Sequence, residues 1–173
     1  MTGQKPIWVA IRVRTAFEGA VTTQLRADGF EVFTPWCRCQ GQSDAHGVSE
    51  TPLFPNYVFC RIHSEVPLSV LMTPGVLYVI GTGKTVATPV DEVEIGAIKT
   101  VVQSGLRYQP WPFVNTGEKV LIVDGPLRKV EGILVKSDDS RIAVGVSLVQ
   151  RTVLSDLGTG AAIVRLSSTK TAP

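Results

Sequence analysis

The chain has 173 residues, of which 44% are hydrophobic and 18% charged, and its formal net charge is +2 at pH 7. This composition excludes a wholly disordered protein, and the length is enough for one ordinary domain or two small ones. No apolar run approaches the roughly 20 residues that a membrane-spanning helix needs, and Arg12 follows the N-terminus too closely for a secretory signal. We therefore expect a cytoplasmic protein without a membrane partner.

Residues 1–105 alternate between strand-like and helix-like patterns. Strands are expected at residues 7–13, 30–39, 52–62 and 76–80. Helices are expected at residues 15–28, 65–72 and 91–104, where capping residues and apolar spacing agree. This order is typical of a split β-α-β arrangement. It predicts an α+β fold class, with a ferredoxin-like N-terminal domain whose helices cover one face of a mixed sheet.

Two polar segments interrupt this first domain. Residues 40–50 are polar and contain glycine, which predicts a flexible hairpin loop. Residues 81–85 read Gly-Thr-Gly-Lys-Thr, a glycine spacing that is too tight for a phosphate-binding loop. A hairpin turn is the better interpretation of this second segment.

The pattern changes in the second half of the chain. Residues 106–116 contain two prolines and show no clear period, which predicts a linker. Short β-rich runs follow at residues 119–123, 130–136, 141–149, 151–154 and 161–166. Because turn-forming residues separate these runs, they predict a small SH3-like barrel over residues 117–167, followed by a frayed tail at 168–173.

The residues that usually carry chemistry form no recognisable catalytic site. The three cysteines are Cys37, Cys39 and Cys60, and the two histidines are His46 and His63. Zinc is one interpretation of this set, but structural zinc sites space their cysteines by about two to four residues, and no second close pair follows. Buried or half-exposed thiols are the other interpretation. We expect a protein that is not an enzyme and has no catalytic residues, cofactor or metal.

An ordered set of motifs carries a resemblance to a known family. Leu53–Phe59 reads L-F-P-N-Y-V-F, and Gly117–Val135 reads as a strand, an Asp-Gly-Pro turn and a strand opened by glycine. Thr73–Val76 (T-P-G-V) and Ile80–Gly81 stand between them, and Trp8 lies in the opening I-W-V-A. The second run resembles a KOW motif, and the others resemble the NusG N-terminal domain. Over nearly its whole length, the chain resembles NusG and its paralogues of the RfaH type.

This resemblance implies a transcription elongation or antitermination factor. Its N-terminal domain would bind the clamp helices of the RNA polymerase β′ subunit, reach the β subunit, suppress pausing and touch non-template DNA or nascent RNA. Its KOW barrel would recruit either termination factor Rho or a ribosomal protein. A factor that docks on so large a complex is expected to be a monomer.

The resemblance assigns the clamp-helix contact to aromatic residues of the first domain, namely Trp8, Phe54, Tyr57 and Phe59. Aromatic side chains suit this role because they bury a large area at little entropic cost. By strand alternation, Tyr57 and Phe59 share one face of the sheet, while Val58 and Cys60 share the other. The alternative is that one of these aromatic sets is simply core.

Further contacts are implied for three polar residues, each with a simpler alternative. Thr73 stands where family members contact the β subunit, but it could equally be a hydroxyl at a helix end. Arg12 and Arg14 end the first strand, where they face either nucleic acid or solvent.

Two positions depart from the family pattern. The barrel's recruiting loop, for which Leu148, Val149 and Arg151 are the expected partner contacts, carries Val149 where NusG has an aromatic. Val9 stands where the first strand usually has a second aromatic. These departures weaken the expectation of Rho recruitment and favour a specialised paralogue that acts in processivity or antitermination.

Some paralogues of the RfaH type refold the second domain between a helical hairpin and a barrel. Here Val120–Val123 and Ile142–Val146 have strong β preference, and the helical propensity of this half is low. We expect a stable barrel that does not switch.

The main rival is an RNA-binding module that acts through the barrel. Residues 105–173 carry 9 Lys/Arg and 6 Asp/Glu, hence a net charge of +3, whereas residues 1–104 carry 8 and 9, hence −1. The cations expected on phosphate are then Lys119, Arg128, Lys129, Lys136 and Arg151. Binding would weaken steeply with salt. The near-neutral first half argues against RNA as the only partner.

Overall fold

The computed structural model describes residues 5–39, 49–63, 65–82, 86–135 and 140–166. The chain divides between Glu92 and Val93 into two compact parts, which we call the sheet unit (1–92) and the barrel unit (93–173). The predicted turn at 83–85, the tail at 168–173 and most of the predicted loop at 40–50 lie outside the described residues. Within the described ranges, no helix is both long enough and apolar enough to cross a bilayer.

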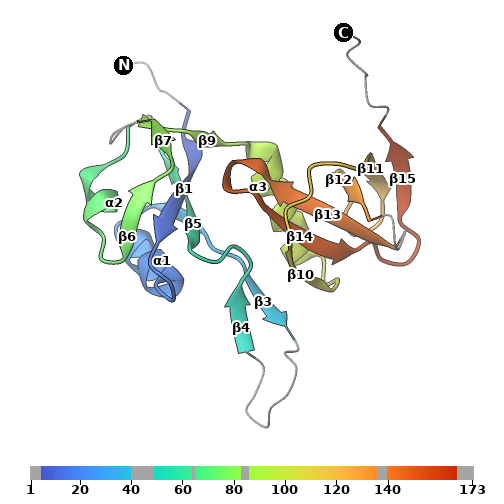
Figure 1. Ribbon diagram of the computed structural model, residues 1–173, viewed down its shortest axis with the longest axis horizontal. Coiled ribbons are helices and arrows are strands. Elements are labelled where there is room, and N and C mark those ends of the chain that lie inside the picture. Colours follow the sequence, from blue (N-terminus) through green and yellow to red (C-terminus); the bar gives the residue numbers. More distant parts are fainter. Residues whose placement is uncertain (1–4, 40–48, 64, 83–85, 136–139, 167–173) are drawn as a thin grey trace. The chain divides into compact units, whose positions relative to one another are not determined.

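An antiparallel sheet forms the centre of the sheet unit (Figure 1). Its strands are β1 (Ile7–Val13), β2 (Glu31–Phe33), β5 (Tyr57–Ile62), β6 (Val76–Val79) and β9 (Pro89–Val90). The order is β2-β5-β1-β6, and β9 also pairs with β1. Because β1 and β2 both run antiparallel to the strand between them, they are parallel to each other without touching. This is the split β-α-β arrangement of a ferredoxin-like fold.

The expectation of a mixed sheet is therefore wrong in one respect, since every strand pairing of the described residues is antiparallel. The helices α1 (Glu18–Ala27) and α2 (Leu68–Met72) both cover the same face, as expected. Their apolar side chains pack with those of β1, β2 and β5 in one buried cluster. That cluster includes Val9, Ile11, Val21, Leu25, Val58, Cys60, Ile62 and Val70.

Proline interrupts the predicted strand at residues 30–39 and opens the one at 52–62, and in the structure each of these segments is divided between two strands. Residues 30–39 form β2 and β3 (Trp36–Cys39), with a break at Pro35, whose carbonyl accepts a hydrogen bond from the N–H of Leu53. Residues 52–62 contain the end of β4 (Ser49–Pro52), a turn, and β5. Strands β3 and β4 pair as a hairpin, and β7 (Gly81–Thr82) pairs with β8 (Val86–Ala87).

The barrel unit holds a six-stranded antiparallel sheet. It follows the helix α3 (Glu92–Gln103), which buries Ile95, Ala97, Ile98 and Val101. The strands are β10 (Tyr108–Trp111), β11 (Glu118–Asp124), β12 (Glu131–Leu134), β13 (Arg141–Val146), β14 (Arg151–Asp156) and β15 (Ala162–Arg165). Their order is β10-β14-β13-β12-β11-β15, and a short 3-10 turn, η1 (Ser147–Val149), joins β13 to β14.

The predicted linker at 106–116 needs a correction, because Tyr108–Trp111 is a strand that pairs with β14. Pro110 hides this strand in the sequence, since proline lacks the N–H that an internal strand needs. Here β10 has a strand on one side only, where proline is tolerated. The division of the chain also falls before α3, whereas the predicted boundary of the first domain is residue 105.

The Asp-Gly-Pro turn between β11 and β12 and the strand β12 each need a glycine. Gly125 has φ +100°, and its carbonyl accepts a hydrogen bond from the N–H of Arg128 at 3.1 Å. The turn buries Leu127 completely. At Gly132 the constraint is proximity, since a Cβ there would lie 2.6 Å from the side chain of Ile142 and 2.7 Å from the carbonyl oxygen of Ala143.

We expect Gly132→Ala to destabilise the barrel unit by about 1–3 kcal/mol, since the neighbouring strand must move to admit the methyl group. Gly96→Ala is the matched control, because this helical glycine has nothing within 4 Å of its Cβ position. There the same change should stabilise by about 0.5–1 kcal/mol. Urea unfolding followed by circular dichroism measures both, and equal midpoints would contradict the close approach.

Candidate functional site

The candidate site is the sheet face opposite the helices, which we call the aromatic face. Strand register places three pairs directly opposite each other on it, namely Trp8 with Arg61, Ala10 with Phe59, and Arg12 with Tyr57. Phe33 of β2 pairs with Phe59, and Tyr78 of β6 pairs with Arg12. The predicted alternation along β5 is confirmed, since Val58 and Cys60 belong to the helix-covered cluster.

Three phenylalanines form the centre of this face. The rings of Phe54 and Phe59 meet edge to face, with centroids 5.1 Å apart and planes at 85°. Phe33 lies on the other side of Phe59, at 6.4 Å. Phe54 is 1% exposed and Phe59 is 0% exposed, so both rings serve as packing. Trp8 is also buried, and among the four predicted clamp-helix residues only Tyr57 is partly exposed. The contacts predicted for the other three stay predictions.

One end of the aromatic face is open and combines a cation with phenol rings. The Arg12 guanidinium lies 4.8 Å from the centre of the Tyr57 ring, a cation–π contact. Tyr78, opposite Arg12 on the other neighbouring strand, is 54% exposed. Arg12 is therefore held between two tyrosine-bearing strands, whereas Arg14 is exposed beyond the strand end.

At the other end of the aromatic face, the cation is held in ion pairs. The Arg61 guanidinium lies 5.8 Å from the centre of the Trp8 ring and forms ion pairs with Glu31 at 3.4 Å and Glu92 at 2.8 Å. Glu92 also accepts a hydrogen bond from Lys5 at 3.2 Å. This hydrogen bond, the charge of Lys5 and the charge of Arg61 all lower the pKa of the Glu92 carboxyl.

The turn that presents Tyr57 is fixed by a buried carboxylate. The N–H of Asn56 donates to Oε1 of Glu18 at 2.8 Å, and the Asn56 amide donates to the hydroxyl of Thr15 at 2.9 Å. Asn56 has φ +69°, a left-handed conformation that asparagine tolerates better than most residues. Glu18 is 3% exposed, so the sequence pattern that places it in the first turn of α1 conceals its structural role.

Thr73 ends α2 with its hydroxyl engaged by the helix itself. The hydroxyl donates to the carbonyl oxygen of Ser69 at 2.9 Å, and the side chain is buried. This geometry fits the interpretation of Thr73 as a hydroxyl at a helix end. The contact with the β subunit stays a prediction.

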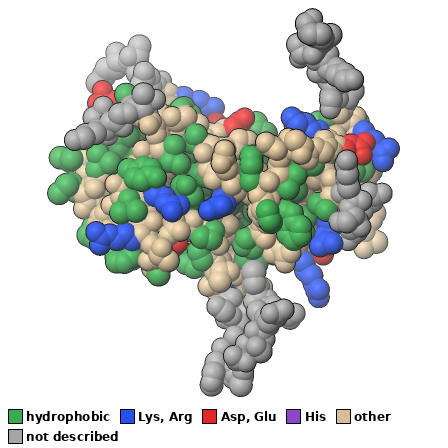
Figure 2. Space-filling view, viewed as in Figure 1, with side chains coloured by type: hydrophobic (Ala, Val, Ile, Leu, Met, Phe, Trp, Pro, Cys, Tyr) green, Lys and Arg blue, Asp and Glu red, His purple; other side chains and the backbone are tan. Residues whose placement is uncertain are grey.

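Exposed apolar residues surround this helix end, and sequence reasoning missed them. Leu68 and Met72 are 71% and 73% exposed on α2, and Leu77 is exposed on β6. Figure 2 shows hydrophobic side chains gathered over this part of the sheet unit. The signal is weak because the helix sequence LSVLM is apolar at every position except Ser69 and is too short to show a period.

In the barrel unit, the predicted recruiting loop lies on η1. Val149 is buried, Leu148 is half-buried and Arg151 is exposed. The backbone N–H of Ser147 donates to both carboxylate oxygens of Glu94, at 3.2 and 3.1 Å, and its hydroxyl donates to Oε1. The buried side chain of Val149 therefore supports the turn, while the side chains of Leu148 and Arg151 are at least partly accessible at its surface.

Of the predicted zinc candidates, the structure describes the side chains of Cys37, Cys60 and His63. Cys37 and Cys60 are buried, and His63 is exposed. His46 is outside the described residues, and the described part of the chain holds no group of three or more potential metal ligands.

Comparison with known proteins places this architecture in a family. Residues 6–99 match the family described as "Transcription termination factor nusG". The NusG transcription termination/antitermination protein of Escherichia coli K12 is 27% identical over 88% of this chain and 93% of its own length. The Pseudomonas aeruginosa protein of the same name is 31% identical over 63% of this chain and 64% of its own length. A Thermotoga maritima NusG structure, titled for its domain interaction, is 18% identical with a TM-score of 0.43, covering 94% of this chain and 93% of that one.

The split β-α-β sheet unit, which is followed along the chain by a small β-rich unit, carries a match to a family of transcription termination factors. The chain belongs to the NusG family.

We expect Glu18→Ala to destabilise the sheet unit by about 1–3 kcal/mol, because the Asn56 N–H would lose its charged acceptor in a part-buried position. Glu18→Gln, which keeps an acceptor oxygen of the same reach, should cost less than half as much. Denaturant midpoints of the two variants decide this, and equal losses would show that the charge and not the hydrogen bond matters.

A pH prediction follows from Cys60. Burial, with a smaller contribution from the charge of Glu31, raises the pKa of the Cys60 thiol from 9.0 to about 12. Because the folded-state pKa is the higher one, the stabilising contribution is complete below about pH 9 and is lost as the pH rises toward 12. Between these values the wild type should lose about 1 kcal/mol more per pH unit than Cys60→Ala. Urea unfolding at pH 8 and pH 10 measures the difference, and parallel losses would contradict the shift.

Proposed function

We propose that this protein is an elongation factor that binds RNA polymerase through the open end of its aromatic face. The observation that carries the proposal is the pair formed by Arg12 and Tyr57, which is partly exposed on a sheet whose other face is covered by α1 and α2. Tyrosine and arginine are the residues most often found at the energetic centre of protein interfaces. The occupant is the coiled coil of the β′ clamp helices, which presents the apolar and acidic side chains that such a pair recognises.

In this proposal, the role of Phe33, Phe54 and Phe59 is to support the interface by packing. The contacts of Phe59 with Phe54 and Phe33 anchor β5, the strand that begins with Tyr57. They bury area within the sheet unit and leave the contact with polymerase to the side chains at the open end. Truncating Phe54 would therefore damage the fold itself, by about 3–5 kcal/mol on general grounds.

A second contact is proposed at the end of α2. Leu68 and Met72 are exposed there and offer an apolar surface beside the turn that Thr73 closes. We assign this surface to the β subunit, on the far side of the polymerase cleft from the clamp helices. In this proposal, the factor contacts the polymerase on both sides of its cleft and opposes the opening of the cleft that accompanies pausing. This would account for a role in processivity or antitermination. Arg14 and Arg12 lie near the first contact and are the proposed points of approach for non-template DNA or nascent RNA.

The barrel recruits a further factor through Leu148 and Arg151 in this proposal. The buried position of Val149 supports an assignment to a specialised paralogue of the RfaH type, since the recruiting turn offers no exposed aromatic anchor. Such a turn is better suited to a ribosomal protein than to Rho. Segments Val120–Val123 and Ile142–Val146 lie in β11 and β13, in keeping with a barrel that does not refold into helices.

We expect Tyr57→Ala to weaken binding of the full-length protein to a β′ clamp-helix coiled coil by about tenfold or more, as loss of a central aromatic contact does. Tyr108→Ala is the control, since it removes the same half-buried side chain from the barrel unit. Isothermal calorimetry with the isolated coiled coil measures both. Unchanged affinity in Tyr57→Ala, with the fold retained, would refute the proposed interface.

A further inference from the structure

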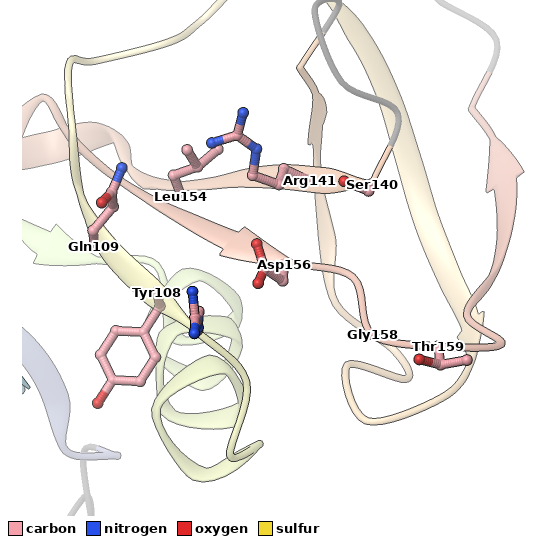
Figure 3. A pocket seen from close by; sticks show the side chains of 9 residues that line it. Tyr108, Gln109, Ser140, Arg141, Leu154, Asp156, Gly158 and Thr159 are labelled. Atoms are coloured by element: carbon pink, nitrogen blue, oxygen red, sulfur yellow. The ribbon is translucent and has the colours of Figure 1, made fainter.

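The barrel unit contains an open pocket of about 630 Å³ beside the strands β10, β14 and β13 (Figure 3). This volume is in the range of sites for small molecules and single nucleotides, about 300–1,000 Å³. The wall on one side is the loop after β14, where Gly158 has φ +81° and its Cβ position lies 3.2 Å from Leu106. All of the lining residues belong to the barrel unit, so the pocket is complete within it.

The charged residues of the pocket form a row across three strands. Register places Asp156 directly opposite Arg141, and the Asp156 N–H donates to the carbonyl oxygen of Arg107 at 3.0 Å. Side chains opposite each other in neighbouring strands point to the same face, so Arg107, Asp156 and Arg141 share one side of the sheet. Among the described lining residues, Arg107 and Arg141 are the cations and Asp156 is the anion.

The rest of the lining suits a ligand that is partly polar. Ser140, Gln109 and Thr159 are exposed and offer neutral hydrogen-bonding groups. Leu154 is 2% exposed and lies between Gln109 and Arg141, which reach to the same side of the strands (Figure 3). The pocket thus has an apolar floor with cations and polar groups at its rim.

We propose that this pocket binds a phosphodiester group of single-stranded nucleic acid, with Arg107 and Arg141 contacting the phosphate oxygens. Arginine is favoured for this task because its planar guanidinium offers two parallel N–H donors to an anion. Leu154 provides the apolar surface for the attached sugar or base, and the rim residues satisfy its polar groups.

This site differs from the set of cations that charge alone suggested. Lys119, Arg128, Lys129 and Arg151 are exposed on the barrel but do not line the pocket, and Lys136 is outside the described residues. Arg107 was hidden in the segment predicted as a linker, and the strand β10 brings it beside Asp156.

The pocket and the recruiting turn lie at opposite ends of the same hairpin. Arg141 begins β13 and Val146 ends it, which separates the two sites by about 17 Å at the usual rise of a strand. Binding of nucleic acid at the pocket therefore leaves Leu148 and Arg151 accessible to a protein partner.

The test is fluorescence anisotropy with the full-length protein and a labelled 12-nucleotide single-stranded RNA, with DNA of the same sequence in a second arm. The double variant Arg107→Ala/Arg141→Ala should bind at least tenfold more weakly. Its salt dependence should also fall, by about 0.7 in the slope of log K against log salt concentration, because one phosphate is no longer neutralised. The matched control is Lys119→Ala/Arg128→Ala, which removes the same charge from exposed positions elsewhere on the barrel and should change binding less than threefold.

A third variant tests the sign of the effect. Asp156→Asn keeps the shape of the side chain and removes the negative charge that lies beside Arg107 and Arg141, so it should tighten binding a few-fold. Equal binding of RNA and DNA identifies the phosphodiester alone as the ligand, and preference for RNA adds recognition of the 2′-hydroxyl. An equal loss in the control variant, or no saturable binding by the wild type, would overturn the proposal. Clamp-helix binding is measured on the same variants and should not change, which separates this result from the polymerase interface.

Discussion

The pairing of β1 with β5 is the constraint on which the sheet unit depends. This ladder joins Ile7 to Ile62 at one end and Arg12 to Tyr57 at the other. Because side chains alternate along a strand, one register assigns every residue to a face, and a slip by one residue would exchange the two faces. The helix-covered cluster and the aromatic face are therefore two results of a single alignment.

The ends of that ladder differ in what holds them. At one end Arg61 is fixed over Trp8 and paired with two carboxylates, a geometry closed to further partners on the carboxylate side. At the other, Arg12 lies over Tyr57, with no ion pair shown for it among the described contacts. A cation over a phenol ring keeps its outer N–H groups available. The same residue types thus serve structure at one end of the strand pair and the proposed recognition at the other.

The sequence predicted the elements well where local signals agree with tertiary packing. The first strand matches β1, and the alternation of β5 correctly separates Tyr57 from Val58. Helix α1 begins at Glu18 and not at residue 15 as predicted, because Ala16 adopts φ +67° and ends the preceding turn. Burial of Phe54 could not be predicted, since the ring lies outside any strand and meets Phe59 only after the turn at Asn56 has formed. Likewise, a row made of Arg107, Arg141 and Asp156 requires three strands to assemble, and no local pattern announces it.

The proline that concealed β10 has a consequence for solubility. The barrel sheet is open in its strand order, with β10 and β15 as its two edges, and an exposed edge is a template for a strand of another molecule. Pro110 removes one N–H from the first edge, and the ion pair between Arg165 and Glu118, at 2.8 Å, places charge along the second. Both devices oppose edge-to-edge stacking between copies. The two edges thus limit the pairing of one molecule's sheet with that of another copy.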